Sequence, residues 1–435
     1  MKYYSTNRKA PEVSLQEAVV KGLAPDKGLY MPERINSLPK EFFEQMPEMG
    51  LQEMAYQVAD AFFGEDVPAE KLRQIVFDTL SFEIPLVKVT EQIYSLELFH
   101  GPTLAFKDVG ARFMARLLAH FNKEQVNVLV ATSGDTGSAV ANGFLGVEGI
   151  HVYVLYPKGK VSRLQEAQFT TLGQNITAIE VEGTFDDCQA LVKNAFIDAE
   201  LNAHMKLTSA NSINVARFIP QSFYYFWAIA QLMKNSQFSI LNSQLNTVIC
   251  VPSGNFGNIT SGLFGKRMGL PVKRFIAANN RNDVFFRYLQ NGLYDPHPTI
   301  ATYANAMDVS DPSNFVRLFE LYGSYDAIKN DISGATYTDE QIAETIRQCY
   351  KNNGYLLDPH GACGYRALQE GLQEGEVGIF LETAHPAKFK DRVDAILGTD
   401  IAIPEKLQAF MKGQKQTVPM ANDFNAFKSY LLSES

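Results

Sequence analysis

The 435-residue sequence contains few cysteines and has no excess of positive charge. Its four cysteines form no C-x-x-C pair and have no histidine at zinc-ligand spacing, so neither a disulfide framework nor a metal site is expected. The formal net charge of −9 argues against nucleic acid or an anionic membrane as the main partner. We therefore expect a local cluster of residues to bind any phosphate group of a ligand.

Long apolar runs are also absent. No apolar leader follows Met1, and the longest strongly apolar run, Phe223 to Met233, is too short to span a bilayer and includes Gln231. The sequence has no HExxH, GxSxG or Walker A motif, so metalloprotease, serine hydrolase and P-loop NTPase functions lose their usual support. We expect a cytoplasmic protein without a membrane partner.

Short β-rich runs alternate with helical patterns along most of the chain. The length favours two or more lobes, and 46% hydrophobic with 20% charged residues is typical of a globular protein. The predicted strands are Val128–Ala131, His151–Tyr156, Ala178–Val181, Thr247–Val251, Phe275–Ala278, Tyr355–Leu357 and Val377–Leu381. This alternation predicts an α/β protein with mainly parallel sheets flanked by helices.

The first 80 residues form a separate helical N-terminal region in this prediction, and the chemistry-bearing core begins with a strand near Ile84. A helix is expected from Phe185 to Ala199. Thr338 and Gln341 have the spacing of a capping box, which predicts the start of another helix.

Lys107 is the best candidate for a covalent role. It follows the apolar residues Leu104, Ala105 and Phe106 at the start of a helical pattern, and such a flank favours the neutral amine over the ammonium ion. A neutral lysine can form a Schiff base with a carbonyl compound. The alternative is a solvated lysine at a helix start, paired with Asp108.

Two glycine-rich turns lie between a predicted strand and a predicted helix. The turn Ser253–Asn258 lets backbone N–H groups converge on an anion at a helix N-terminus, which suits a phosphate monoester. The turn Thr132–Ser138 has the same placement and adds hydroxyl groups, so a carboxylate is a suitable ligand there. A tight turn that needs glycine for backbone reasons alone is the alternative for the first of them.

Two further polar segments contain candidate binding residues. Thr383 follows the last predicted strand, where its hydroxyl can bond a heterocyclic nitrogen or merely cap a turn. Arg217 ends the polar run that begins at Asn211, and a guanidinium group can bind phosphate with two hydrogen bonds. A capped helix with a solvated arginine remains the alternative for that run.

The order and spacing of the motifs closely resemble the threonine synthase family. The motifs are GLAPDKGLYMPE (22–33), HGPTLAFKD (100–108), TSGDTGSA (132–139), NSINVAR (211–217), PSGNFGN (252–258), LDPHGACG (357–364) and LETAHPAKF (381–389). The resemblance implies a two-lobed fold-type II enzyme that depends on pyridoxal 5′-phosphate (PLP). It also implies an N-terminal region at 1–80 and a catalytic region at 81–435, with a smaller lobe at about 105–215.

The resemblance also implies roles for individual residues. Lys107 matches the lysine that binds the cofactor covalently and later moves protons. The implied ligands of the cofactor phosphate are Ser253, Gly254, Asn255, Phe256, Gly257 and Asn258, and the implied partner of the pyridine nitrogen is Thr383. The implied substrate-binding residues are Ser133, Gly134, Asp135, Thr136, Lys160, Ser212 and Arg217. No metal ligand is implied.

The implied reaction converts O-phospho-L-homoserine and water to L-threonine and phosphate by γ-elimination and β-addition of water. Many fold-type II relatives have asparagine where this chain has Asp135, so the role of that carboxylate stays open. Two alternatives also stay open, a PLP-dependent phospholyase that yields 2-oxobutyrate and a non-catalytic phosphate-binding module. The sequence does not predict the oligomeric state.

Overall fold

The computed structural model describes residues 1–122, 124–235 and 246–434 and divides into two compact units. The first unit comprises Met1, Pro32–Phe106 and Phe218–Ala402, and the second comprises Lys2–Met31, Lys107–Arg217 and Ile403–Ser435. Neither unit is continuous in sequence. The predicted regions, which meet at residue 80, remain a prediction.

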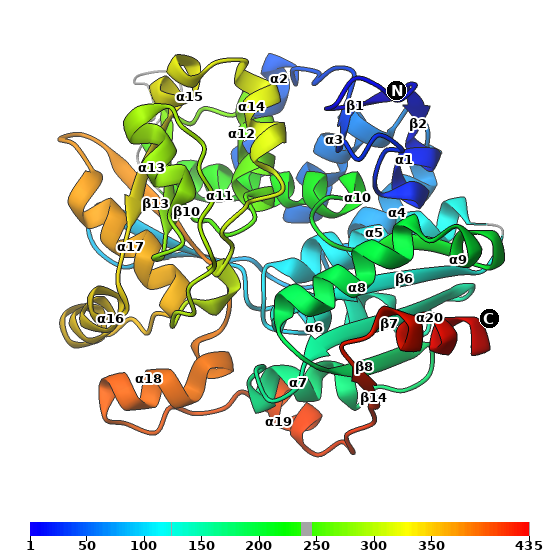
Figure 1. Ribbon diagram of the computed structural model, residues 1–435. Coiled ribbons are helices and arrows are strands. Elements are labelled where there is room, and N and C mark those ends of the chain that lie inside the picture. Colours follow the sequence, from blue (N-terminus) through cyan, green and yellow to red (C-terminus); the bar gives the residue numbers. More distant parts are fainter. Residues whose placement is uncertain (123, 236–245, 435) are drawn as a thin grey trace. The chain divides into compact units, whose positions relative to one another are not determined.

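The first unit is built on a six-stranded sheet of order β12-β11-β10-β13-β5-β4 (Figure 1). Its strands are β4 (Leu86–Lys88), β5 (Ile93–Glu97), β10 (Thr247–Pro252), β11 (Arg274–Asn279), β12 (Ile332–Thr336) and β13 (Val377–Glu382). All neighbouring strands are parallel except β4 and β5, which are antiparallel. The carboxyl ends of β10, β11 and β13 therefore lie along one edge of the sheet.

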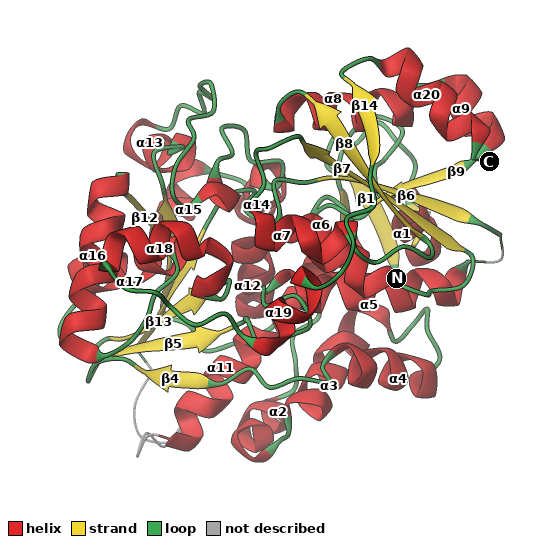
Figure 2. Cartoon of the chain, turned by 90° about the horizontal axis from the view of Figure 1, so that it is seen from below, coloured by secondary structure: helices red, strands yellow, loops and turns green. Residues whose placement is uncertain are grey.

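Helices cover both faces of this sheet. They are α2 (Lys40–Gln45), α3 (Leu51–Phe63), α4 (Ala69–Thr79), α11 (Ser222–Asn235), α12 (Gly257–Arg267), α13 (Val284–Asn291), α14 (Phe315–Tyr322), α15 (Tyr325–Asp331), α16 (Asp339–Asn353), α17 (Pro359–Gly371) and α18 (Lys390–Leu397). Short 3-10 turns are η1 (Met46–Glu48), η2 (Ile219–Gln221), η3 (Asn305–Met307) and η4 (Pro386–Phe389). Figure 2 shows α16 and α17 on one face and α11 and α12 on the other. The apolar residues of α16 and α17 form one core with those of β10, β11 and β13.

The second unit is built on a five-stranded sheet of order β14-β8-β7-β6-β9, which is parallel throughout. Its strands are β6 (Val126–Ala131), β7 (Ile150–Pro157), β8 (Ile176–Glu182), β9 (Lys206–Ser209) and β14 (Val418–Ala421). A small sheet of order β2-β1-β3 contains β1 (Lys2–Ser5), β2 (Val13–Ser14) and β3 (Tyr30–Pro32). The predicted α/β class with mainly parallel sheets is confirmed.

The helices of the second unit follow the same layered arrangement. They are α1 (Leu15–Lys21), α5 (Lys107–Phe121), α6 (Asp135–Phe144), α7 (Arg163–Thr170), α8 (Phe185–Ile197), α9 (Ala199–His204), α10 (Val215–Phe218), α19 (Glu405–Met411) and α20 (Phe424–Ser433). Apolar residues of α8, α9 and α20 share one core with the strands. In the described ranges, no helix is both long and apolar enough to cross a membrane.

Two predictions of secondary structure are wrong in detail. Tyr355–Leu357 is not a strand but part of the linker between α16 and α17, and it is attached to β5 through a side chain, since the Tyr355 hydroxyl is hydrogen-bonded with Ser95 Oγ (2.8 Å) and Glu97 Oε1 (2.9 Å). The helix predicted from Phe185 to Ala199 ends at Ile197, because the extended Asp198 begins a new helix and accepts from the Leu201 N–H. The capping box of Thr338 and Gln341 is confirmed.

Candidate active site

The turn before Lys107 is held against the segment that follows β13. The Phe106 N–H donates to the Thr383 carbonyl at 2.9 Å, and the His385 N–H donates to the Leu104 carbonyl at 3.0 Å. Leu104 has a positive φ of 58°, a conformation that costs energy for a branched residue and persists only where its surroundings impose it. The two motif segments, far apart in sequence, therefore form one fixed structure that ends directly before Lys107.

Lys388 reinforces this structure. Its side chain is fully buried, and Nζ donates to the Thr103 carbonyl at 2.8 Å. A buried ammonium group is costly unless it is hydrogen-bonded, so this contact matters for the turn. The sequence motif contained Lys388, but nothing in its pattern indicated a buried role.

Lys107 begins α5, as predicted, and its side chain is only 15% exposed. Its Nζ lies 4.0 Å from Oδ2 of the buried Asp135, the first residue of α6. The other oxygen, Asp135 Oδ1, accepts from Gln165 Nε2 at 2.8 Å. Gly134 has a φ of 142°, and a Cβ there would lie 2.6 Å from the Gln165 amide, so this amide packs where only glycine fits. The lysine is thus not a solvated surface residue.

Arg217 is 2% exposed and is not a solvated arginine. Its Nε donates to the Ala210 carbonyl at 2.6 Å, and Nη1 donates to the Lys107 carbonyl at 3.2 Å. The guanidinium group passes so close to Gly110 that a Cβ there would lie 2.6 Å from Nη1. Arg217 therefore fixes the backbone of the candidate catalytic lysine.

The other predicted substrate residues of this unit follow neighbouring strands. Ser133 to Thr136 come after β6, Lys160 follows β7 and Ser212 follows β9. Because β7, β6 and β9 are adjacent and parallel, their carboxyl ends meet at one edge of the sheet. Lys160 is exposed there, and Ser133 and Ser212 are partly exposed. The sheet thus brings these polar groups to one edge.

The predicted phosphate loop lies between β10 and α12. Phe256 has a φ of 62° and stands at the N-cap of the 11-residue helix α12, where its own side chain makes no capping hydrogen bond. Asn258 Oδ1 accepts from the hydroxyls of Tyr224 (2.6 Å) and Tyr225 (2.7 Å), which aims its Nδ2 elsewhere. That buried Nδ2 has no hydrogen-bond partner in the described part of the chain. An uncapped helix start and an orphaned amide donor fit the phosphate group of the predicted cofactor.

Residues before and within α14 hold the predicted phosphate loop in place. Asn255 Oδ1 accepts from the Ser313 N–H at 2.6 Å, and the Asn255 carbonyl accepts from Asn314 Nδ2 at 3.1 Å. Asn314 Oδ1 in turn accepts from the fully buried Arg317 at 2.8 Å. Burial lowers the pKa of Arg317 to about 9. Arg317 was missed in the sequence, where it is one arginine in the ordinary amphipathic pattern of α14.

Thr383 lies one residue beyond β13, at the same sheet edge as the phosphate loop. Its side chain is buried. A hydroxyl at this position can donate a hydrogen bond to a neutral heterocyclic nitrogen. Thr383 therefore fits its predicted partner, the pyridine ring.

The histidines of the motifs have structural contacts. His385 caps η4, where Nδ1 accepts from the Ala387 N–H at 3.1 Å. Burial and the nearby His100 lower the pKa of His385 to about 4, so this ring is neutral at neutral pH. His100 Nε2 lies 2.7 Å from Glu97 Oε2. Both rings are thus held by contacts with the protein itself.

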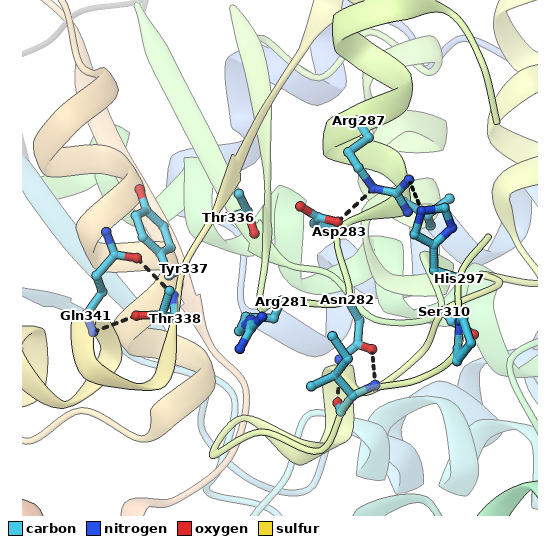
Figure 3. Close-up of a pocket in the computed structure, with 13 residues that line it drawn as sticks. Arg281, Asn282, Asp283, Arg287, His297, Ser310, Thr336, Tyr337, Thr338 and Gln341 are labelled. Atoms are coloured by element: carbon cyan, nitrogen blue, oxygen red, sulfur yellow. Dashed lines mark hydrogen bonds and ion pairs between the residues drawn. The ribbon is translucent and has the colours of Figure 1, made fainter. Parts of the chain in front are cut away.

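A pocket of about 520 Å³ opens elsewhere in the first unit, beyond the ends of β11 and β12. Figure 3 shows Arg287 between Asp283 and His297, with Arg281 and Gln341 at other points of the wall. None of the predicted site residues lines it. The pocket is therefore separate from the residues that form the candidate site.

Known families match the chain in three segments. The model of a family described as pyridoxal-phosphate dependent enzyme matches residues 83–382. Models described as the threonine synthase N terminus and the C-terminal part of threonine synthase match residues 2–80 and 361–431. Together they cover nearly the whole chain.

Individual relatives agree with these matches. A threonine synthase from Haemophilus influenzae is 45% identical over 433 residues, which are 99% of this chain and 100% of the relative. The crystal structure of threonine synthase from Escherichia coli has a TM-score of 0.93 at 42% identity and covers 100% of both chains. The structure of PLP-bound threonine synthase from Brucella melitensis has a TM-score of 0.93 at 35% identity and covers 100% of this chain and 99% of that chain.

Proposed function

The chain belongs to the threonine synthases, a family of PLP-dependent lyases, and we propose that it converts O-phospho-L-homoserine and water to L-threonine and phosphate. The observation that carries the proposal is the 45% identity to a threonine synthase over 99% of this chain.

The cofactor is PLP. We propose that the backbone of the Ser253–Asn258 loop and the orphaned amide of Asn258 bind its phosphate, that Thr383 bonds its pyridine nitrogen, and that Lys107 binds it covalently. Bound PLP supplies an electron sink for negative charge that develops on the substrate carbon atoms. A hydroxyl partner leaves the ring nitrogen uncharged, which favours elimination and replacement over transamination.

Lys107 is the proposed acid–base group. Its amine takes the proton from Cα of the substrate and then one from Cβ, so that phosphate leaves from Cγ; protons return to Cγ and Cα, and water adds its hydroxyl group at Cβ. The carboxylate of Asp135, 4.0 Å from Nζ, stabilises the lysine when it carries the proton. The hydrogen bond from Arg217 to the Lys107 carbonyl keeps the lysine backbone in place during these transfers.

The substrate phosphate is proposed to meet the edge formed by β7, β6 and β9. Lys160 and Ser212 supply a cation and a hydroxyl there, while the buried Arg217 contributes positive charge close to Lys107. Ser133 to Thr136, at the start of α6, are proposed to receive the substrate carboxylate, because the positive end of the helix dipole favours an anion. The protein thereby separates the two anionic ends of the substrate.

The proposal is tested by product analysis. Purified, PLP-loaded protein is incubated with O-phospho-L-homoserine, and threonine, phosphate and 2-oxobutyrate are quantified in one sample. Equal amounts of threonine and phosphate are expected, and both disappear in Lys107→Ala. Phosphate with 2-oxobutyrate identifies a phospholyase, and no product from the loaded wild-type protein refutes the assigned substrate.

A further inference from the structure

A buried network joins the end of β13 to the start of α17. Asp358 caps α17, and its Oδ1 accepts from the Gly361 N–H at 2.6 Å. Glu382 Oε1 accepts from the Asp358 N–H at 2.6 Å. Asp358 and Glu382 are 0% exposed and His360 is 2% exposed, yet none of the three takes part in the proposed chemistry.

The contacts of His360 determine its tautomer. Nε2 accepts from the Ala306 N–H at 3.1 Å, and since a backbone N–H only donates, Nε2 carries no proton. The proton is therefore on Nδ1, which donates to Asp358 Oδ2 in a short hydrogen bond. Both ring nitrogens are thus hydrogen-bonded, Nδ1 to the residue that caps α17 and Nε2 to the η3 turn.

The η3 turn lies directly behind the phosphate loop. A Cβ at Gly254 would lie 2.8 Å from the Ala306 carbonyl oxygen and 2.9 Å from the Cα of Met307, so the turn and the loop touch through their backbones. The other side of the turn is tied to the end of β11, where Asn280 Nδ2 donates to the Ala304 carbonyl at 3.2 Å. A movement of Ala306 toward the loop would therefore displace Gly254.

The opposite end of the network reaches Thr383. Glu382 directly precedes Thr383, and a Cβ at Gly361 would overlap the Glu382 carboxyl group, so this side chain has no space to move. Burial and the neighbouring Asp358 carboxylate raise the pKa of Glu382 well above its usual range. One continuous set of buried contacts thus runs from Thr383 through α17 and His360 to Gly254.

We propose that His360 is a positioning residue that sets the separation between Thr383 and the phosphate loop, and so aligns the two ends of the bound cofactor. This inference rests on the proposed placement of the PLP phosphate at the loop and of the ring nitrogen at Thr383. His360 acts through Ala306 and Gly254 and touches no reacting atom.

The test uses two substitutions that each keep one of the two hydrogen bonds. His360→Gln places a carbonyl oxygen near the position of Nε2, where it can accept from Ala306. His360→Asn places its amide near Nδ1, where it can donate to Asp358 but cannot reach Ala306. The measurements are the dissociation constant of PLP, the ³¹P chemical shift of bound PLP and the melting temperature of the apoprotein. His204, an exposed residue of the second unit, gives the matched controls His204→Gln and His204→Asn.

We expect His360→Asn to weaken PLP binding by about threefold to tenfold, the worth of one lost hydrogen bond, and to move the ³¹P resonance. His360→Gln should stay closer to wild type in both measurements, and the His204 variants should match wild type. Equal PLP affinity and equal ³¹P shifts in the two His360 variants, whatever their melting temperatures, would overturn the proposal.

Gly254→Ala separates this inference from the proposed placement of the cofactor. Its new methyl group must move the loop away from Ala306, so PLP affinity should fall if the loop binds the phosphate. Unchanged affinity in Gly254→Ala would refute the placement itself. A fall in Gly254→Ala together with indistinguishable His360 variants would refute only the role of His360.

Discussion

Gly361→Ala should destabilise the first unit because the new methyl group has no space. Its Cβ would lie 2.9 Å from Glu382 Oε1 and would overlap Oε2 and Cδ, and Glu382 is 0% exposed. Overpacking of this kind costs about 1–3 kcal/mol. Loss of the 2.6 Å bond from the Asp358 N–H adds about 0.5–1.5 kcal/mol, and the higher helix propensity of alanine returns about 1 kcal/mol.

The net expectation is a loss of about 0.5–3.5 kcal/mol. For a cooperative unit of this size, each kcal/mol lowers the melting temperature by about 2–4 °C, so a fall of several degrees is expected in the apoprotein. Differential scanning calorimetry of the apoprotein measures it. The absorbance of the bound cofactor should also change, because a shift of Glu382 moves Thr383, the proposed partner of the pyridine nitrogen.

Gly371→Ala is the matched control on the same helix. Its Cβ would lie 3.3 Å from the Cδ1 methyl of Ile276, a contact that a small side-chain adjustment relieves. Its melting temperature should equal or exceed that of wild type. If Gly361→Ala has the same melting temperature as Gly371→Ala, Glu382 has more space than the structure shows, and the tight packing of the network is refuted.

Three further predictions concern other parts of the chain. Burial works to raise the pKa of Glu376, but hydrogen bonds, foremost from Arg274, lower the pKa to about 2. The ionised Glu376 therefore contributes about 3 kcal/mol to the free energy of unfolding, and this contribution should be lost as pH falls from about 4.5 toward 2. Denaturation of wild type at pH 7 and pH 3 should show about 2 kcal/mol of this loss, because pH 3 lies between the two pKa values, and Glu376→Gln should lack it; equal pH dependence would contradict the assignment. Lys388→Met removes the hydrogen bond to the buried Thr103 carbonyl and should destabilise the apoprotein by about 0.5–1.5 kcal/mol in urea unfolding, whereas an unchanged midpoint would show that the bond is dispensable. Lys160→Ala should lower kcat/KM at least tenfold without loss of PLP, while Lys158→Ala should not; equal effects would remove Lys160 from the substrate site.

The parts of the fold that depend on local sequence were predictable. The run Thr247–Val251 and the glycine turn after it predicted β10, the loop and α12, because a strand, a tight turn and a helix each have a short-range signature. The start of α5 at Lys107 was predicted for the same reason. The roles of these residues came from the resemblance of whole motifs and not from their local pattern.

The features that were missed depend on partners far away in sequence. Tyr355 bonds to Glu97, 258 positions away, and this contact attaches its segment to β5 through a side chain. His360 bonds to Ala306, 54 positions away, and a single sequence contains no sign of that pairing. Arg317 has the spacing of a surface residue, but tertiary packing buries it behind the loop. Local patterns can locate the elements, whereas these contacts arise only when the sheet brings its strand ends together.

The central claim is that phosphate leaves by cleavage of the Cγ–O bond and that water adds at Cβ. Turnover of O-phospho-L-homoserine in H₂¹⁸O, followed by mass spectrometry of both products, tests it most directly. The account predicts one ¹⁸O atom in the hydroxyl group of threonine and none in the released phosphate. Labelled phosphate with homoserine as the second product would mean hydrolysis at phosphorus and would contradict the account.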